Sequence, residues 1–372
     1  NSGNYVIVWE GEGNGDDYGV FGQRYNFLGA TQGSEFRVNT YTANDQDSQS
    51  VAMDNSGNFV VVWESSSQDG NDNEVYAQRY NSSGLAAGSE FRVNTYVTKN
   101  QNNPSVAMDD NGNFVVVWES FSQDGDYFGI FGQRYNSSGL AVGSEFKINS
   151  YTTDAQVYPS VAMDSNGNFV VAWQDGYYNY DTEIGYYGIY AQRYNSSGIP
   201  QGSEFSVNTT TEGSQEDSDL AMDSNGNFVI TWDSESQDGS SWGVYAQRFD
   251  SAGNMQGSEF LVNTYTNGDQ SVPSIGMDSN GDFVIAWDSE GQDGSSWGVY
   301  AQRFDSAGNM QGSEFLVNSL TFSPQINAAV VMDQTGNFIV SWQTYTPYAG
   351  DAPDYEIENI FTQRYKANGE HL

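Results

Sequence analysis

Short apolar runs separated by turn-forming residues recur along the entire chain. In the stretch 105–149, the apolar run SVAM precedes the turn DDNGN, and the run FVVVW follows it. The segment GIFGQRY then leads through the turn NSSG to SEFKIN. Apolar and β-branched runs of this length, bounded by Gly, Asn and Asp, predict β-strands. The pattern therefore predicts four strands, named A to D here, joined by an A–B turn, a B–C loop and a C–D turn.

The tryptophan that ends strand B shows that this unit is repeated. The run FVVVW has no polar alternation, which predicts burial of strand B on both faces of its sheet. Its tryptophan recurs about 55 residues apart, a spacing typical of repeat architectures, and we expect the seven indoles to be core residues: Trp9, Trp63, Trp118, Trp173, Trp232, Trp287 and Trp342.

Seven units of four antiparallel strands predict an all-β fold, a seven-bladed β-propeller of four-stranded antiparallel blades. In a ring, every sheet covers the apolar faces of its neighbours, so no terminal sheet is left exposed. No linker interrupts the repeats, and we expect a single domain over residues 1–372. The approximate repeats are 1–47, 48–102, 103–157, 158–216, 217–271, 272–326 and 327–372.

The first and last repeats each lack one strand in this sequence. The first begins at strand B (residues 5–9), and the last ends after strand C (residues 360–365). We expect the chain to be part of a longer one, with the missing strands supplied by another segment or another chain. Open strand edges can accept a strand from a neighbour, so self-assembly through these edges is one hypothesis.

The B–C loops and the loops between blades are the longer and more variable connections. In an antiparallel meander both sets emerge on one face, which is therefore the expected functional face. Blades five and six repeat each other there: residues 223–263 and 278–318 differ only at Asn227/Asp282, Thr231/Ala286 and Ser236/Gly291. Any function of this part of the chain is thus expected twice.

Charge limits the partners of this surface. The formal net charge is −37, from 49 acidic and 12 basic residues. Nucleic acid binding needs clustered Lys and Arg, so it is not expected. No apolar run is long enough to insert into a membrane. Cations, glycans and another surface protein remain as possible partners, although the charge also serves solubility alone.

The B–C loops repeat the motif Gln-Asp-Gly, which offers a candidate metal site. Acidic, Gly-rich loops supply the carboxylate and backbone oxygens that Ca²⁺ prefers. An Asp-Gly turn whose carboxylate caps its own backbone is the simpler interpretation. The candidate ligands for a possible Ca²⁺ cofactor are Asp69, Asp124, Asp238 and Asp293.

Aromatic residues in the B–C loops are candidates for ligand binding. Trp242 and Trp297 lie in the sequence GSSWG of the twin blades, where an exposed indole beside hydroxyl groups suits a stacked sugar. The loop of blade four offers Tyr177, Tyr178 and Tyr180 in the same way. Packing of these rings against neighbouring loops is the alternative.

A repeated arginine in strand C has a predicted structural role. Strand alternation places it opposite two aromatic residues, in a covered sheet, where a charge needs a partner. The glutamate of GSEF, such as Glu90, and the aspartate after strand A, such as Asp54, repeat with the same period and are the expected partners. The arginines are Arg24, Arg79, Arg134, Arg193, Arg248, Arg303 and Arg364.

Few residues point to an enzyme. The sequence has one histidine, His371, and no cysteine, which excludes a Ser-His-Asp triad built inside the fold and a thiolate metal site. A carboxylate pair for glycoside cleavage is possible among 49 acidic residues, but no pair stands out. We name no catalytic residue from the sequence.

The patterns VAMDxNGNFVVxW, GVYAQRYNSSG and GSEFxVN resemble the propeller-type repeats of large secreted and cell-surface proteins of bacteria. The resemblance covers the whole chain and implies an extracellular or cell-surface location, beside adhesion or calcium-binding modules. The leading interpretation is a non-enzymatic binding or adhesion scaffold, possibly glycan-binding and calcium-assisted. The alternatives are a structural subunit of an extracellular filament, sheath or surface layer, and a polysaccharide-degrading propeller enzyme.

Overall fold

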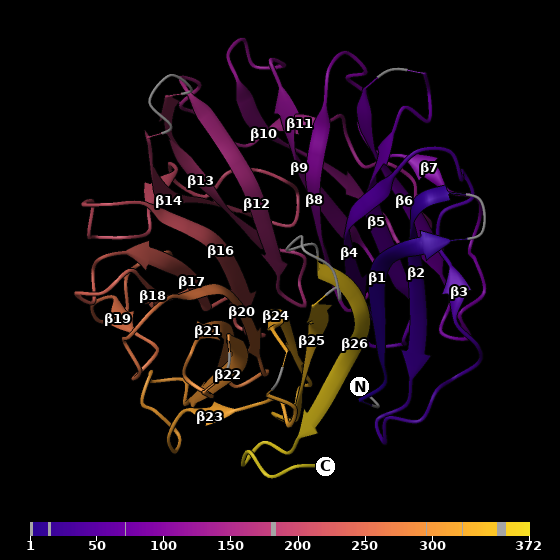
Figure 1. Ribbon diagram of the computed structural model, residues 1–372. Coiled ribbons are helices and arrows are strands. Elements are labelled where there is room, and N and C mark those ends of the chain that lie inside the picture. Colours follow the sequence, from indigo (N-terminus) through magenta and orange to yellow (C-terminus); the bar gives the residue numbers. More distant parts are fainter. Residues whose placement is uncertain are drawn as a thin grey trace. The chain divides into compact units, whose positions relative to one another are not determined.

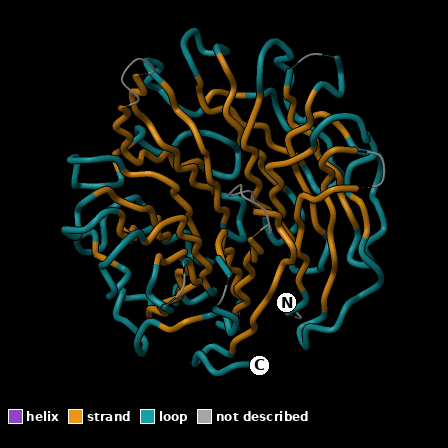
Figure 2. The backbone as a smooth tube through the Cα atoms, in the orientation of Figure 1, coloured by secondary structure: helices purple, strands orange, loops and turns teal. Residues whose placement is uncertain are grey.

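The computed structural model describes residues 3–13, 16–70, 72–179, 184–294, 296–321, 323–347 and 355–372. These residues form strands, turns and loops, and no helix occurs among them (Figure 2). No described segment is therefore a helix that could cross a membrane. The strands form seven antiparallel sheets in chain order, so the predicted all-β, seven-bladed β-propeller is confirmed.

Contacts divide the chain into two compact units, residues 1–184 with 190–205 and residues 185–189 with 206–372. The first unit contains blades one to three and most of blade four (Figure 1). Blade one consists of β1 (Tyr5–Gly13), β2 (Asp16–Tyr25) and β3 (Phe36–Arg37); blade two of β4 (Gln46–Met53), β5 (Phe59–Ser66), β6 (Asn73–Tyr80) and β7 (Phe91–Arg92); blade three of β8 (Gln101–Met108), β9 (Phe114–Phe121), β10 (Phe128–Tyr135) and β11 (Phe146–Lys147); blade four of β12 (Ala155–Met163), β13 (Phe169–Asn179), β14 (Ile184–Tyr194) and β15 (Phe205–Ser206).

The second unit contains blades five to seven. Blade five consists of β16 (Gln215–Met222), β17 (Phe228–Glu235), β18 (Trp242–Phe249) and β19 (Phe260–Leu261); blade six of β20 (Gln270–Met277), β21 (Phe283–Glu290), β22 (Trp297–Phe304) and β23 (Phe315–Leu316); blade seven of β24 (Gln325–Met332), β25 (Phe338–Pro347) and β26 (Tyr355–Tyr365). Among the described strands the first and last blades have three each, as predicted.

Strand B is buried because its two faces contact different blades. In β5, Val60 and Val62 pack with Trp118 of the following blade, whereas Val61 and Trp63 pack with Val20 of the preceding blade. An uninterrupted apolar run is what such a two-sided position requires. Six of the seven tryptophans are buried core residues as predicted, whereas Trp9 of the first blade is half-buried. Five of the six are fully buried: Trp63, Trp118, Trp173, Trp232 and Trp287.

Strand A carries a bulge that the sequence pattern did not predict. In β8 the register to β9 shifts between Asn102 and Ser105, and Asn103 inside this bulge has φ +50°. A bulge re-aims the backbone of a strand, here so that an N–H group points out of its own sheet. The same left-handed conformation occurs at the equivalent residues Ser48, Tyr158, Asp217, Val272 and Asn327.

The predicted pairing with carboxylates is wrong for five of the seven repeated arginines. Arg79 donates instead to the backbone carbonyls of Ser137, at 2.9 Å, and Ser138, both in the C–D turn of the next blade. Arg24, Arg134, Arg248 and Arg303 make the equivalent bond. The side chain lies at the end of strand C, where it is only half-buried, so its charge needs no buried counter-ion.

The predicted carboxylate partners have other roles. Glu90 accepts bonds from the Gln68 amide at 2.8 Å and from the backbone N–H of Thr40 at 2.7 Å. Asp54 accepts bonds from the backbone N–H groups of Ser56 and Asn58, both at 2.8 Å, and so caps its own turn. Carboxylates that are satisfied by local N–H donors are not available to a more distant arginine.

Two glycines of one C–D turn allow this arginine contact to be tested. Gly139 and Gly143 both have φ +78°, but a Cβ atom on Gly139 would lie 2.8 Å from Cδ of Arg79, whereas one on Gly143 would meet nothing within 4 Å. Gly143→Ala should cost only the backbone strain, about 1–2 kcal/mol. Gly139→Ala should lower the free energy of unfolding by about 1.5–3 kcal/mol more, because the arginine bonds are displaced. Urea denaturation of both variants measures the difference, and equal losses would show that the arginine contact contributes nothing.

Candidate functional site

The residue that follows the tryptophan of strand B is a buried acid in four blades. Glu64, Glu119, Asp233 and Asp288 lie at this position and are each less than 9% exposed. Glutamine takes their place in blades four and seven, as Gln174 and Gln343. Sequence reasoning missed these residues, although an acid or amide after every repeated tryptophan was the available signal.

Each of these carboxylates accepts the N–H of the strand A bulge in the next blade. The acceptor–donor distances are 3.3 Å for Glu64 and Asn103, 2.9 Å for Glu119 and Tyr158, 3.2 Å for Asp233 and Val272, and 2.7 Å for Asp288 and Asn327. The left-handed bulge residue thus supplies the donor that a buried carboxylate requires. This contact joins successive blades and is a structural role that all four acids share.

In the first unit these acids are satisfied by protein groups. Glu64 accepts a second bond from the amide of Asn73, so both of its oxygens have donors. Burial, followed by repulsion from Asp47, raises the pKa of Glu64 to about 8. Burial also raises the pKa of Glu119 and brings that of Asp47 to about 6. A fully bonded acid is suited to hold two blades together rather than to transfer a proton.

Asp233, in the second unit, differs from the other acids of this position. Its Oδ2 accepts the N–H of Val272, but its buried Oδ1 has no hydrogen-bond partner in the described structure. Burial is the main cause that raises the pKa of Asp233, and the charge of Asp217 is the second. Asp217 is exposed, in the bulge of β16. The structure thus places a buried acid with a raised pKa beside an exposed carboxylate.

Two further acids extend this group. Burial, followed by the charge of Asp217, raises the pKa of Glu216. Burial also raises the pKa of Asp288 to about 7 despite bonds from the backbone N–H groups of Asn327 and Ala328, and Asp217 adds to the shift. Asp217 is therefore within electrostatic reach of three acids with raised pKa values. Pairs of carboxyl groups in such different environments are typical of acid–base sites.

A pocket of about 480 Å³ lies beside Asp288, between blades six and seven of the second unit. Its volume is in the range of small-molecule sites. Strands β20 to β22 and the start of blade seven, side by side in Figure 1, supply its walls. The lining residues are Ser271, Val272, Asp288, Ser296, Trp297, Pro324, Ile326 and Asn327.

The structure places one of the predicted ligand-binding aromatic residues in this pocket. Trp297 begins β22, pairs in register with Glu290 and is partly buried. Trp242 has the equivalent position at the start of β18, opposite Glu235. The side chains of Tyr177 and Tyr178 and all of Tyr180 lie outside the described residues.

The predicted metal ligands lie in separate B–C loops. Asp69 forms an ion pair with Arg92 at 2.8 Å, Asp124 accepts a bond from the Asn149 amide at 3.2 Å, and Asp238 accepts the N–H of Ser240 at 2.9 Å. Asp293 has the position of Asp238 in the twin blade. Among the described residues, no three acidic or histidine side chains come together as a metal site. Calcium binding stays a prediction.

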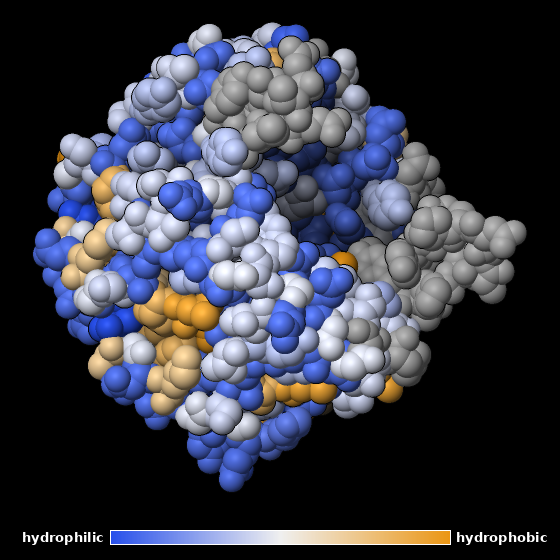
Figure 3. Space-filling view, turned by 60° about the vertical axis from the view of Figure 1, so that its left-hand side comes forward, coloured by the Kyte–Doolittle hydropathy of each residue, from blue (hydrophilic) through white to orange (hydrophobic). Residues whose placement is uncertain are grey.

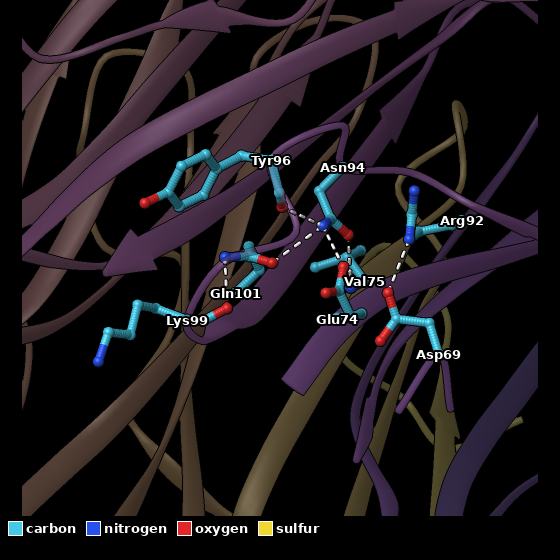
Figure 4. Close-up of polar contacts among 8 residues, drawn as sticks. All are labelled: Asp69, Glu74, Val75, Arg92, Asn94, Tyr96, Lys99 and Gln101. Carbon is cyan, nitrogen blue, oxygen red and sulfur yellow. Dashed lines mark hydrogen bonds and ion pairs between the residues drawn. The ribbon is translucent and has the colours of Figure 1, made fainter. Parts of the chain in front are cut away.

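Blade two shows why Asp69 differs from the other three. In blade three the carboxylate of Asp124 reaches toward Asn149 over Gly129, whereas Glu74 replaces that glycine in blade two. Glu74 is fully buried, and the amide of Asn94 donates to it (Figure 4). The longer side chain thus fills the place of the aspartate, and Asp69 pairs with Arg92 instead (Figure 4).

Comparison with known proteins gives matches in structure alone. In sequence, the chain matches no family model and no curated protein. A polysaccharide lyase, the PL25 ulvan lyase, is 12% identical with a TM-score of 0.62, over 99% of this chain and 90% of that one. An α-L-arabinofuranosidase from Fusarium graminearum is 10% identical, with a TM-score of 0.51, over 86% and 92%. An α-L-arabinanase from Penicillium chrysogenum is 12% identical, with a TM-score of 0.51, over 81% and 90%.

These matches correct the leading interpretation of the sequence. A non-enzymatic binding or adhesion scaffold was expected, but the three solved structures named above, each matched over 90% or more of its length, are a polysaccharide lyase, an arabinofuranosidase and an arabinanase. The interpretation as a non-enzymatic scaffold is therefore contradicted. The sequence misled because it shows the repeats clearly, whereas the acids that break the symmetry lie at positions that look like core.

Proposed function

We propose that this protein is an extracellular enzyme that cleaves a polysaccharide, and that Asp233 and Asp217 are its acid–base pair. The observation that carries the proposal is the environment of these two residues. Asp233 is buried with one oxygen without a partner, and Asp217 beside it is exposed. Similarity of fold to the ulvan lyase and to the two arabinan-type enzymes supports the substrate class.

The proposed reaction is hydrolysis of a glycosidic bond. Glycoside hydrolysis uses one carboxylic acid that protonates the leaving oxygen and one carboxylate that activates water or attacks the sugar. Asp233, whose pKa is raised mainly by its burial, has the properties of the acid. The solvent-exposed Asp217 has the properties of the carboxylate. The proton given by Asp233 is recovered from water as the product leaves.

An extracellular location belongs to the same proposal. Polysaccharides are too large to enter a cell uncleaved, so an enzyme that acts on them has to meet them outside. The absence of cysteine is compatible with secretion without an oxidative folding step. Similarity of fold to the ulvan lyase supports this class of substrate, and the resemblance to repeats of secreted proteins supports an extracellular location.

Product analysis on a polysaccharide panel tests the proposed function. Purified protein incubated with arabinan, xylan, galactan, mannan, glucan and ulvan should release reducing ends from at least one of them. Hydrolysis gives saturated products, whereas a lyase gives products with a new double bond that absorbs ultraviolet light. The proposed enzymatic function would be contradicted if the protein bound a polymer but released reducing ends from none of them.

A further inference from the structure

The pocket between blades six and seven combines the two kinds of group that hold a sugar. Val272, Trp297, Pro324 and Ile326 give it apolar walls, and Ser271, Ser296 and Asn327 add hydroxyl and amide groups. An indole provides a large flat contact surface with one polar edge, which suits the apolar face of a sugar ring. A few polar groups in an apolar cavity fix the orientation of a ligand.

Asp288, the acid among the lining residues of this pocket, is already hydrogen-bonded to the backbone. Both oxygens of Asp288 accept backbone N–H groups, from Asn327 at 2.7 Å and Ala328 at 3.3 Å. The side chain is 2% exposed, and burial raises its pKa to about 7. Asp288 therefore offers little to a ligand, because both of its oxygens already accept backbone N–H groups.

None of the residues that line this pocket is basic. The second unit has four basic residues besides His371, namely Arg248, Arg303, Arg364 and Lys366, all of them described. Arg303 lies six residues along β22 from Trp297, about 20 Å away at the rise of a strand. It donates there to the carbonyls of Ala367 and Gln311, and Lys366 pairs with Glu370 in the same set of turns. A carboxylate or sulfate on a sugar would thus find no counter-ion.

The charge of the rest of the surface also favours an uncharged ligand. The chain carries a formal net charge of −37, and the face in Figure 3 is mostly hydrophilic, with apolar residues in small groups. The negative potential of such a surface repels polyanions and weakens their binding at low ionic strength. Uncharged glycans do not meet this barrier.

The geometry points to a binding subsite for an uncharged sugar ring in the pocket of Trp297, so that the substrate is a neutral glycan. The inference rests on the proposed function and names the substrate class of that enzyme. In the twin blade, Trp242, Glu216 and Asp217 hold the sequence positions of Trp297, Ser271 and Val272. The pocket of Trp297 thus has a hydroxyl group and an apolar side chain where blade five has two acids.

A glycan array followed by calorimetry tests this inference. The array carries uncharged oligosaccharides of arabinan, xylan, galactan, mannan and glucan, and anionic ones from polygalacturonate and ulvan. The inactive Asp233→Asn variant is used, so that binding is measured apart from cleavage. We expect at least one uncharged oligosaccharide to bind, and Trp297→Ala to weaken that binding by about tenfold or more. Met310→Ala, an exposed residue of the C–D turn in the same blade, should leave it unchanged.

The outcomes separate the inference from the proposed function. Binding of an uncharged glycan that depends on Trp297, without cleavage by the unmodified protein, supports the subsite and contradicts the enzyme. Cleavage of a polymer with binding of anionic glycans only, or with binding that Trp297→Ala does not change, supports the enzyme and overturns the subsite. Binding of no uncharged oligosaccharide also overturns it.

Discussion

Replacing Asp233 by Asn should lower kcat on a cleavable polysaccharide by about a thousandfold, with little change in KM. Asn keeps the size of Asp and can still accept the N–H of Val272, so blades five and six stay joined. It cannot supply a proton to the leaving oxygen, and positioned proton transfer contributes about 10²- to 10⁴-fold to a rate. Because the proton is needed in the transition state, the loss falls on kcat rather than on binding.

Asp217→Asn provides the second half of the same test. Asp217 raises the pKa of Asp233, so its replacement should move the pKa of the acid downward. As the pH is raised, the remaining activity of the variant should therefore begin to fall at a lower pH than the activity of the unmodified protein. A purely structural role for Asp217 would lower activity without moving the profile.

The twin blades offer a matched control for these variants. Asp282 and Asn227 are equivalent positions, and both accept a turn N–H, from Ser306 at 2.8 Å and Ser251 at 3.2 Å. Asp282→Asn therefore places in blade six the residue that blade five already has. It should leave activity unchanged and should not lower the melting temperature, because the new amide can donate to Asp278 as Asn227 donates to Asp223 at 2.7 Å. A loss of activity in Asp282→Asn as large as in Asp233→Asn would indicate that any lost carboxylate disturbs the unit.

The fold could be predicted from the sequence because its determinants are local and repeated. The run FVVVW predicts a strand buried on both faces, and β5 and β9 are buried over its full length. The turns with Asp, Asn and Gly lie where strands A and B meet, since Asp54 caps the backbone two and four residues on. Seven repetitions of one pattern predict the architecture, although the pattern of each single strand is short.

The contacts between blades could not be predicted in the same way. Arg79 reaches a carbonyl 59 residues further on, and Glu64 reaches an N–H 39 residues further on. Any partner with the same period fits a repeated sequence equally well, so periodicity cannot distinguish a glutamate from a carbonyl. The left-handed bulge that creates the N–H donor occurs at Ser48, Tyr158 and Val272 alike, so no residue type marks it.

The candidate site could not be predicted from the sequence for a related reason. Asp233 follows a core tryptophan and has the same structural bond as Glu64, Glu119 and Asp288, so its sequence position indicates packing. What distinguishes it is a missing second donor and the neighbour Asp217, and both depend on the register of β16 against β17. By contrast, Trp297 could be proposed as a ligand contact because an aromatic residue in a polar loop is unusual by itself.

The protein should become more stable as the pH falls from about 8 toward 5, because its buried acids bind protons more tightly when folded. Burial raises the pKa of Glu64 from 4.5 to about 8, with Asp47 and Glu119 adding repulsion. Between these values the folded state keeps a proton that the unfolded state releases. The free energy of unfolding contributed by Glu64 is thus fully present below about 4.5 and is lost as the pH rises through about 8, at about 1.4 kcal/mol per pH unit. Asp288, with a pKa of about 7, adds to the same slope.

Glu64→Gln isolates this effect, since Gln174 occupies the equivalent position in blade four and is equally buried. The variant should be more stable than the unmodified protein at pH 8, because it needs no proton to be neutral. Its free energy of unfolding should fall less steeply with pH, by up to about 1.4 kcal/mol per unit between pH 5 and 8. Asp110→Asn, a change at an exposed turn residue, should leave the slope unchanged.

Urea denaturation across this pH range measures the free energy of unfolding of all three proteins. A stability that rises with pH, or a slope that Glu64→Gln leaves intact, would mean that Glu64 is ionised in the folded protein and that its donors, Asn73 and Asn103, outweigh its burial.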